Sequence, residues 1–293
     1  MDIAKSGEEL IKICKEQGIS LSEYAIIREM EDSDLSRYEI INKMKKVLEA
    51  MKNSAKEARD REIYSVSGLI GGDAYKMQQY LKNGKSLTGD TMVLAMAMAL
   101  SSSEVNASMG KIVACPTAGS CGILPAVLLT AGERLHKSDD ELIQGLFAAA
   151  AVGLIIGRNA TFAGAEGGCQ AECGSASAMA SAAIVELMGG TPKMSLDAGA
   201  IIFKNVLGLV CDPVAGLVEI PCAKRNSQGA ITALCTADLV MAGVESKIPF
   251  DDALKAMYKV GRELPASLRE TAQGGIAITK TGLALKKKVF GES

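Results

Sequence analysis

Cysteine is the residue type in this chain whose number and placement best suit chemistry. Eight cysteines occur in 293 residues, and Cys169, Cys211 and Cys222 fall in stretches with glycine or proline that predict loops. No C-x-x-C pair occurs, which argues against zinc ribbons, thioredoxin-like pairs and the ferredoxin run. Loops at distant positions can still bring their thiolates to one metal site. Spacing alone therefore leaves two interpretations open, buried thiols and metal ligands.

The other five cysteines form two groups. Cys14 and Cys235 occur within helical patterns, where a thiol is expected to be a small buried apolar group. Cys115 and Cys121 frame the loop sequence CPTAGSC, and Cys173 opens a predicted helix. The sequence does not assign a role to these last three.

A second stretch that could bind a ligand is PTAGSCG, residues 116–122, directly before a predicted helix. Hydroxyl groups and free backbone N–H groups at a helix N-terminus can form a seat for an anion. The stretch lacks the Gly-Lys-Ser/Thr ending of a phosphate loop, so a carboxylate suits it better than a nucleotide. An ordinary glycine-rich turn would explain the same residues equally well.

The single histidine limits the hydrolytic chemistry that the chain can perform. His136 lies at the end of a predicted helix, in RLHKSDD, where it favours the helix dipole. A Ser-His-Asp or Cys-His enzyme would have to use this residue, and its charged neighbours indicate an exposed position. Hydrolases of that kind are therefore disfavoured.

The composition is that of a globular protein, with 48% hydrophobic and 23% charged residues and a net charge of −2. This charge gives no reason to expect binding to nucleic acid or to an anionic membrane surface. Eight cysteines are too few for a disulfide scaffold, and the N-terminus has no long apolar segment typical of a secretion signal. The longest apolar run, 145–157, is too short to span a bilayer. We therefore expect a cytoplasmic protein with reduced cysteines.

The elements that must position the cysteines are helices. Aromatic residues make up 4% of the chain, Trp is absent, and β-branched alternation is rare, which together predict an all-α fold. An amphipathic helix is expected over 35–61, with its apolar stripe facing the core. Nearly apolar, buried helices are expected over 125–135, 139–156, 174–188 and 229–243.

The loops between these helices are rich in glycine and proline and carry most of the cysteines. Buried loops leave backbone polar groups unpaired unless something binds them, so a ligand or cofactor is expected at the centre of the bundle. We predict an N-terminal helical arm over 1–75 and a larger helical domain over 76–293, or one continuous domain.

Four motifs together resemble a known family. CPTAGSCGILPAVL, AGAEGGCQAECGSASAMA, LGLVCDPVAGLVEIPCAKRN and RETAQGGIAIT are similar to segments of the iron–sulfur-dependent L-serine dehydratases, in particular the α subunit of the two-subunit form. The resemblance covers nearly the whole chain and is strongest over 110–280. Several motifs in the same order make it specific.

The resemblance implies a [4Fe–4S] cluster held by Cys169, Cys211 and Cys222, with one iron left open as a Lewis acid. It implies that L-serine loses its β-hydroxyl and its Cα proton and yields pyruvate and ammonia, without pyridoxal phosphate. A pyridoxal-phosphate dehydratase would need a Schiff-base lysine and a phosphate-binding glycine loop. Lys224 is the best-placed lysine, but the glycine loop is absent.

The resemblance also suggests roles for residues near the cysteines. The substrate carboxylate is expected on the loop residues Thr117, Ala118, Gly119 and Ser120. Arg225 and Asn226, which follow Cys222, are expected to contact the substrate or the cluster. Glu166 is a candidate for orienting the ammonium group or for acting as the base, and capping of the helix at 173 is the structural alternative.

Single-chain members of that family carry an extra domain before this region, so a separate β subunit is expected as partner. A related L-cysteine desulfidase and a threonine-preferring dehydratase remain alternatives on the same scaffold. A non-enzymatic iron–sulfur module is a further alternative, which would close the site with a fourth ligand, Cys173.

Overall fold

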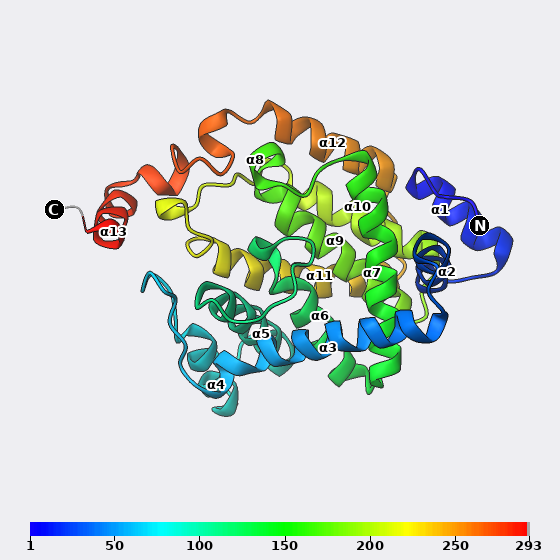
Figure 1. The fold of residues 1–293 in the computed structure, drawn as a ribbon, viewed down its shortest axis with the longest axis horizontal. Helices are drawn as coiled ribbons and strands as arrows, with labels where there is room; N and C mark the ends of the chain where they lie inside the picture. The colour runs from blue at the N-terminus through cyan, green and yellow to red at the C-terminus, as the bar shows by residue number, and fades with distance from the viewer. Residues whose placement is uncertain (292–293) are drawn as a thin grey trace.

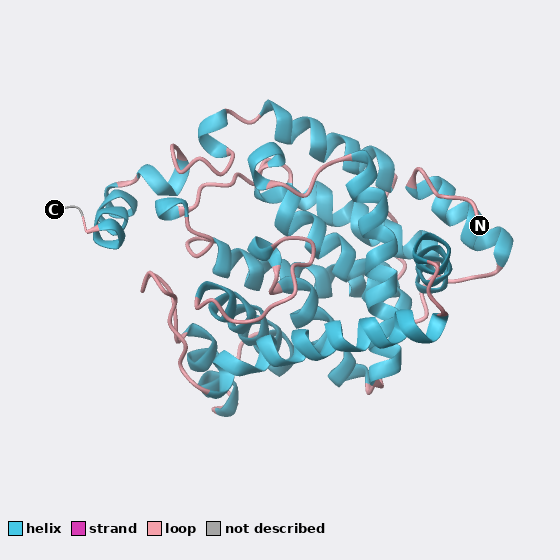
Figure 2. Ribbon diagram, viewed as in Figure 1, coloured by secondary structure: helices cyan, strands magenta, loops and turns pink. Residues whose placement is uncertain are grey.

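The protein is described by a computed structural model covering residues 1–291. The last two residues of the region predicted to span 76–293 therefore lie outside the described residues. Across 1–291 the chain is built from helices and loops, without a strand (Figure 2). Two isolated β-bridges, Tyr64 with Gly71 and Cys211 with Arg269, are the extended pairings in this part of the chain. The predicted all-α fold is confirmed.

Thirteen α-helices account for most of the described residues. They are α1 (Gly7–Gln17), α2 (Leu21–Ser33), α3 (Arg37–Asp60), α4 (Asp73–Lys82), α5 (Asp90–Ala107), α6 (Ile123–Leu135), α7 (Asp139–Asn159), α8 (Gly164–Gly167), α9 (Ser175–Leu187), α10 (Pro192–Val206), α11 (Cys222–Met241), α12 (Phe250–Glu263) and α13 (Lys280–Phe290). Short 3-10 helices are η1 (Ala118–Ser120), η3 (Val214–Gly216), η4 (Ala266–Leu268) and η5 (Gly275–Ile278), and η2 (Gln170–Gly174) is a π-helical turn.

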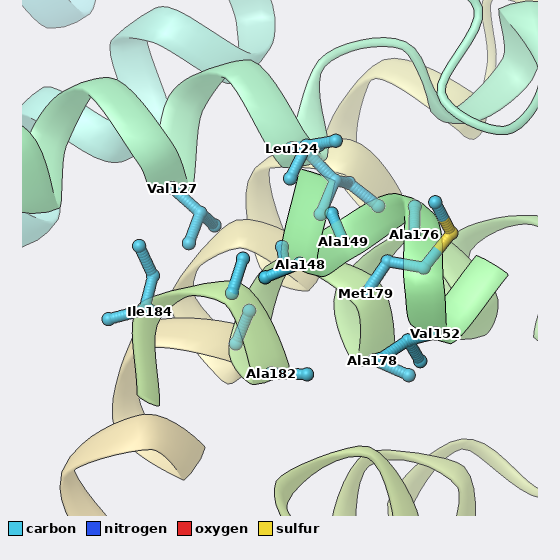
Figure 3. Close-up of a cluster of buried hydrophobic side chains, with 14 of the residues drawn as sticks. Leu124, Val127, Ala148, Ala149, Val152, Ala176, Ala178, Met179, Ala182 and Ile184 are labelled. Atoms are coloured by element: carbon cyan, nitrogen blue, oxygen red, sulfur yellow. The ribbon is translucent and has the colours of Figure 1, made fainter. Parts of the chain in front are cut away.

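Helix α9 lies at the centre of the bundle and contacts α6, α7, α10 and α11 (Figure 1). Its alanines allow the neighbouring backbones to approach closely, and the facing side chains of α6 and α7 fill the remaining space (Figure 3). Leu124, Val127, Ala149, Val152 and Ile184 are all buried there. Such nearly all-round apolar helices are stable only when other helices cover every face. This confirms the prediction of buried, alanine-rich helices.

Helix α7 is also long and apolar enough to pass for a membrane span by length and composition, but two thirds of the relevant window, 67%, is buried inside the protein. Its first turn is fixed by a capping box in which the Ser138 side chain accepts from the Glu141 N–H and Glu141 accepts from the Ser138 N–H. The burial agrees with the core helix expected from the apolar run at 145–157.

The long amphipathic helix is confirmed as α3, which crosses α5, α6 and α7 along one side of the bundle (Figure 1). Ile40, Leu48, Met51 and Ala55 form its buried stripe. A reciprocal capping box at Ser36 starts the helix. This stripe belongs to the same apolar cluster as α6, α7 and α9. The domain boundary near residue 75 stays a prediction.

One helix begins earlier than predicted. Helix α11 starts at Cys222, whereas the sequence placed its first residue near Gly229. Gly229 lies inside this helix. A side chain would not fit there, because a Cβ would lie 2.7 Å from Ile123 Cδ1 and 2.8 Å from Ser177 Oγ. The glycine thus permits close packing of α11 on α6 and α9, and does not mark a helix end. Cys222 consequently lies in the first turn of a helix and not in a loop.

Glu104 is a buried carboxyl group, 1% exposed, on α5. Its Oε1 accepts from the Asp73 N–H at 2.7 Å and the Ala74 N–H at 3.2 Å, which caps the first turn of α4. Its Oε2 has no hydrogen-bond partner among the described residues. Burial raises the pKa of Glu104 to about 7, although the two N–H groups oppose this shift.

Replacing Glu104 by Gln is expected to make stability less sensitive to pH. The folded-state pKa lies above the ordinary value of 4.5, so the folded chain binds more protons and Glu104 destabilises it increasingly as pH rises from about 4.5 to 7. Between pH 4 and pH 8 the unfolding free energy of Glu104→Gln should therefore gain on the order of 3 kcal/mol over the parent.

Chemical denaturation of both chains at the two pH values measures this gain. Glu49→Gln, on the exposed side of α3, is the control and should leave the pH dependence of the parent unchanged. An equal pH dependence in Glu104→Gln and the parent would show that the carboxyl group ionises without penalty.

Candidate active site

Four buried cysteines from three parts of the chain meet beside the N-terminus of α9. Cys169 directly precedes the π-helical turn η2 and Cys173 lies within it, Cys211 precedes η3, and Cys222 is the first residue of α11. The Cys169 and Cys173 Sγ atoms are 3.4 Å apart. All described cysteines are free thiols. The structure thus brings together the three residues that the sequence singled out, and adds Cys173.

Backbone contacts hold the Cys211 segment in place. The Cys211 N–H donates to the Leu268 carbonyl at 2.9 Å, and the Cys211 carbonyl accepts from the Glu270 N–H at 2.7 Å. The thiol packs against Gly164 of α8, where a Cβ would lie 3.0 Å from Cys211 Sγ. Glycine at position 164 therefore leaves room for the sulfur or for a group bound to it.

The protonation of the thiols reflects this clustering. Burial raises the pKa of Cys211 far above its usual range and that of Cys222 to about 12, and in both the charge of Cys169 adds to the effect. A hydrogen bond from Cys173, supported by the positive charge of Arg225, lowers the pKa of Cys169. Three mutually repelling buried thiolates are stable only when a cation lies among them.

The four thiols are a donor set of the kind that an iron–sulfur cluster can use. Within residues 1–291 no three His, Cys, Asp or Glu side chains are gathered closely enough to hold one metal ion. A single tetrahedral ion needs its sulfur ligands about 2.3 Å from one point, whereas each cysteine on a cluster binds a different iron. Soft thiolates and a dry surrounding are the donor set that iron–sulfur clusters use.

The loop expected to hold a carboxylate lies next to these thiols. Thr117 caps η1, and its hydroxyl lies 3.1 Å from the Ser120 hydroxyl. The N–H groups of Ala118 and Gly119 have no acceptor among the described residues, while Ser120 is buried and its hydroxyl contacts the Thr117 backbone. The loop therefore offers two free N–H groups to an anion.

The structure shows positioning contacts for Asn226 and Arg225. The Asn226 amide donates to the Gly119 carbonyl at 2.7 Å and accepts from the Gly122 N–H at 2.9 Å, so it fixes the middle of the loop and its C-terminal end. Arg225 donates to the Val210 carbonyl at 2.8 Å and to Asp212 at 2.9 Å, on either side of Cys211. These side chains link α11 to the two loops that form the site.

The two glutamates near Cys169 differ in position. Glu166 is exposed on α8, and neither η2 nor α9 has a side-chain cap at its start. The structure therefore does not bring Glu166 to the thiols or to the helix end. Glu172, which the sequence analysis did not select, is close to both the loop and the thiols.

Glu172 connects the carboxylate loop to the cysteines. Its Oε1 accepts from the Thr117 hydroxyl at 2.8 Å, and its Oε2 lies 3.9 Å from Cys211 Sγ. Gly119 and Gly164 make room for it, because a Cβ at these positions would lie 3.0 Å and 2.8 Å from its oxygens. Burial raises the pKa of Glu172, and the bond from Thr117 opposes this shift.

Sequence spacing could not separate the two glutamates, since Glu166 and Glu172 lie three residues on either side of Cys169. The structure decides between them, because Glu166 lies exposed on α8, whereas Glu172 lies on the π-helical turn with its oxygens at Thr117 and Cys211. Such turns occur often at functional sites. The only available sequence indication was the position of Glu172 beside Cys173.

Comparisons with known proteins show which family the chain resembles. The family model described as serine dehydratase alpha chain matches residues 16–277. The chain is 49% identical to the probable L-serine dehydratase alpha chain of Bacillus subtilis over 97% of this chain and 94% of the relative. It is 47% identical to the L-serine dehydratase alpha chain of Peptoniphilus asaccharolyticus, over 98% of each.

A longer relative, L-serine dehydratase 1 of Escherichia coli, is 34% identical over 94% of this chain and 61% of its own length. The part matched by the family model, residues 16–277, includes every segment that forms the site. Thr117, Glu172 and all four clustered cysteines fall within it. This chain belongs to the serine dehydratase alpha chain family.

Proposed function

We propose that this chain is the catalytic subunit of a [4Fe–4S]-dependent L-serine dehydratase that forms pyruvate and ammonia without pyridoxal phosphate. The observation that carries the proposal is the continuous path from the Thr117 hydroxyl through Glu172 to Cys211, with distances of 2.8 and 3.9 Å. An anion seat and a carboxylate beside buried thiols would let one site bind the substrate carboxylate, remove a proton and hold a Lewis-acid cluster.

Cys169, Cys211 and Cys222 would hold the cluster, which when bound supplies Lewis-acid assistance to departure of the serine β-hydroxyl through its open iron. The free N–H groups of Ala118 and Gly119 bind the substrate carboxylate, and the Thr117 hydroxyl lies beside them. This seat fixes the Cα–H bond relative to Glu172, so the reacting groups meet in one orientation.

Glu172 then accepts the Cα proton on a carboxylate oxygen. The proton taken from Cα and the departing hydroxyl group together make one water, and their loss gives aminoacrylate. Aminoacrylate tautomerises to the imine, and a second water converts the imine to pyruvate and ammonia. Asn226 and Arg225 act as positioning residues, because they hold the carboxylate loop and the Cys211 segment.

A second candidate function rests on Cys173. Its sulfur lies 3.4 Å from that of Cys169, so a closed four-cysteine site would suit a non-enzymatic iron–sulfur module. Replacing Cys173 by Ala separates the two candidates. A dehydratase keeps its iron and its activity in this variant, whereas a closed site loses iron.

We further propose that the enzyme works with a separate β subunit in the reducing cytoplasm. The names of the two relatives that align over nearly their full length include "alpha chain", which supports a second chain. Free cysteines throughout the described residues suit a reducing compartment.

The test is anaerobic purification together with the β subunit, followed by analysis of iron and sulfide and by a pyruvate assay. We expect about four irons per chain, loss of activity in air, and no effect of carbonyl reagents that trap pyridoxal phosphate. Full activity after removal of the cluster would contradict the proposal. The same assay with threonine and cysteine measures substrate preference and tests the desulfidase and threonine alternatives.

A further inference from the structure

The last helix of the described chain extends away from the bundle. Residues 274–290, here called the C-terminal arm, comprise η5 and α13. Figure 1 shows α13 at the far side of the molecule from α1, beyond the packed helices. Its main contacts are with the short elements η3 and η5. Nearly all of α13 thus lacks support from the core.

The C-terminal arm exposes a set of large apolar side chains. Ile276 is 41%, Ile278 51%, Leu283 46% and Phe290 55% exposed, and Gly282 is the only buried residue of α13. An isolated helix of 11 residues is marginally stable in water even with favourable residues. A helix of this length with so little burial therefore needs a further surface on its apolar side.

The charge of the C-terminal arm has one sign. Lys280, Lys286, Lys287 and Lys288 give it four positive charges, and it contains no Asp or Glu, although the whole chain has a net charge of −2. None of these lysines forms an ion pair within residues 1–291. A complementary surface would have an apolar groove with carboxylates along its rim.

The C-terminal arm is attached directly to the candidate active site. The Ile276 N–H donates to Asp212 Oδ2 at 2.8 Å, and Asp212 also pairs with Arg225 at 2.9 Å. Asp212 belongs to the segment between Cys211 and Cys222. In the same segment, Glu219 accepts a hydrogen bond from the Ser67 hydroxyl at 2.6 Å. A protein bound to the arm would therefore lie beside the segment that carries Cys211 and Cys222.

We propose that the C-terminal arm is the docking surface for the β subunit, which receives α13 in an apolar groove lined by acidic residues. The inference rests on the proposed two-chain dehydratase. The Escherichia coli relative is matched over 61% of its length, so about two fifths of that single chain lies outside the part shared with this one. A second chain equivalent to that part, placed next to the site, is the occupant that the arm fits.

The test measures binding of the β subunit, expressed as a separate chain, to the parent and to Leu283→Asp/Phe290→Asp. Both side chains are exposed, so the variant should keep the parent's melting temperature and iron content. We expect its Kd for the β subunit to rise about 30-fold or more, as for central interface residues. Leu87→Asp, at an exposed apolar residue outside the arm, is the control and should bind as the parent does.

Hydrogen exchange provides a second measurement. Amides of 280–290 should exchange rapidly in the isolated chain and become protected when the β subunit binds. Lys286→Glu/Lys287→Glu/Lys288→Glu should weaken binding and reduce its dependence on salt. Equal binding by the parent and both arm variants, without protection of α13, would overturn the proposal.

Self-association of the isolated chain that Leu283→Asp/Phe290→Asp abolishes would show that a second copy occupies the arm, and would also overturn it. Failure of the proposed function is seen separately. If the complex forms and depends on the arm but produces no pyruvate, the docking surface stands and the assigned reaction is wrong.

Discussion

Alanine at Cys169, Cys211 or Cys222 is expected to remove nearly all bound iron and, with it, pyruvate formation. Each of these buried residues would supply one of three thiolates, and two thiolates leave two irons without a protein ligand. Iron and sulfide analysis of anaerobically purified protein, together with visible absorbance, measures the loss. The fold should persist, because a Cys-to-Ala change removes only one small buried atom.

Two other cysteines serve as controls for this experiment. Cys235 is exposed on α11, which corrects the expectation that it would be buried, and Cys235→Ala should retain all iron. Cys14 is buried in α1 as expected, so Cys14→Ala should retain iron at a cost of about 1 kcal/mol in stability. Iron that survives in Cys222→Ala and is lost in Cys173→Ala would assign the third ligand to Cys173.

Glutamine at position 172 is expected to lower kcat by about 10²–10⁴-fold, the range for loss of a general base. The amide oxygen can still accept the bond from the Thr117 hydroxyl, now 2.8 Å long, so the seat is preserved and KM should change little. Steady-state kinetics of pyruvate formation give both constants, and iron content shows that the cluster site is intact.

Glu166→Gln is the matched control, because Glu166 is exposed and equally far from Cys169 in sequence. Its kcat should stay within about twofold of the parent, since surface substitutions away from a site have small effects. A large fall in kcat for Glu166→Gln with a normal Glu172→Gln enzyme would exchange their roles. A fall in iron content for Glu172→Gln would make Glu172 a positioning residue for the thiols.

The sequence determined the helical architecture because helix patterns are local. The 3.6-residue stripe of Ile40, Leu48 and Met51 and the alanine-rich run in α7 needed no knowledge of distant residues. The start of α11 could not be placed in this way. Glycine has a low helix propensity, so the sequence suggested that the helix begins at Gly229. Only the close packing against Ile123 and Ser177 explains why a glycine occurs inside this helix.

The sequence also determined which residue types form the site, since the motifs contain the cysteines and the carboxylate loop. What only the tertiary structure decided is which groups meet. Thr117 and Glu172 are 55 residues apart, and Asn226 is 107 residues from Gly119. Contacts at these separations depend on how α6, α9 and α11 pack. Glu172 reaches the site from the π-helical turn η2, whereas Glu166 lies exposed on α8. Local sequence patterns carry no information about such contacts, because the contacts form only when helices that are distant in the sequence pack together in the folded core.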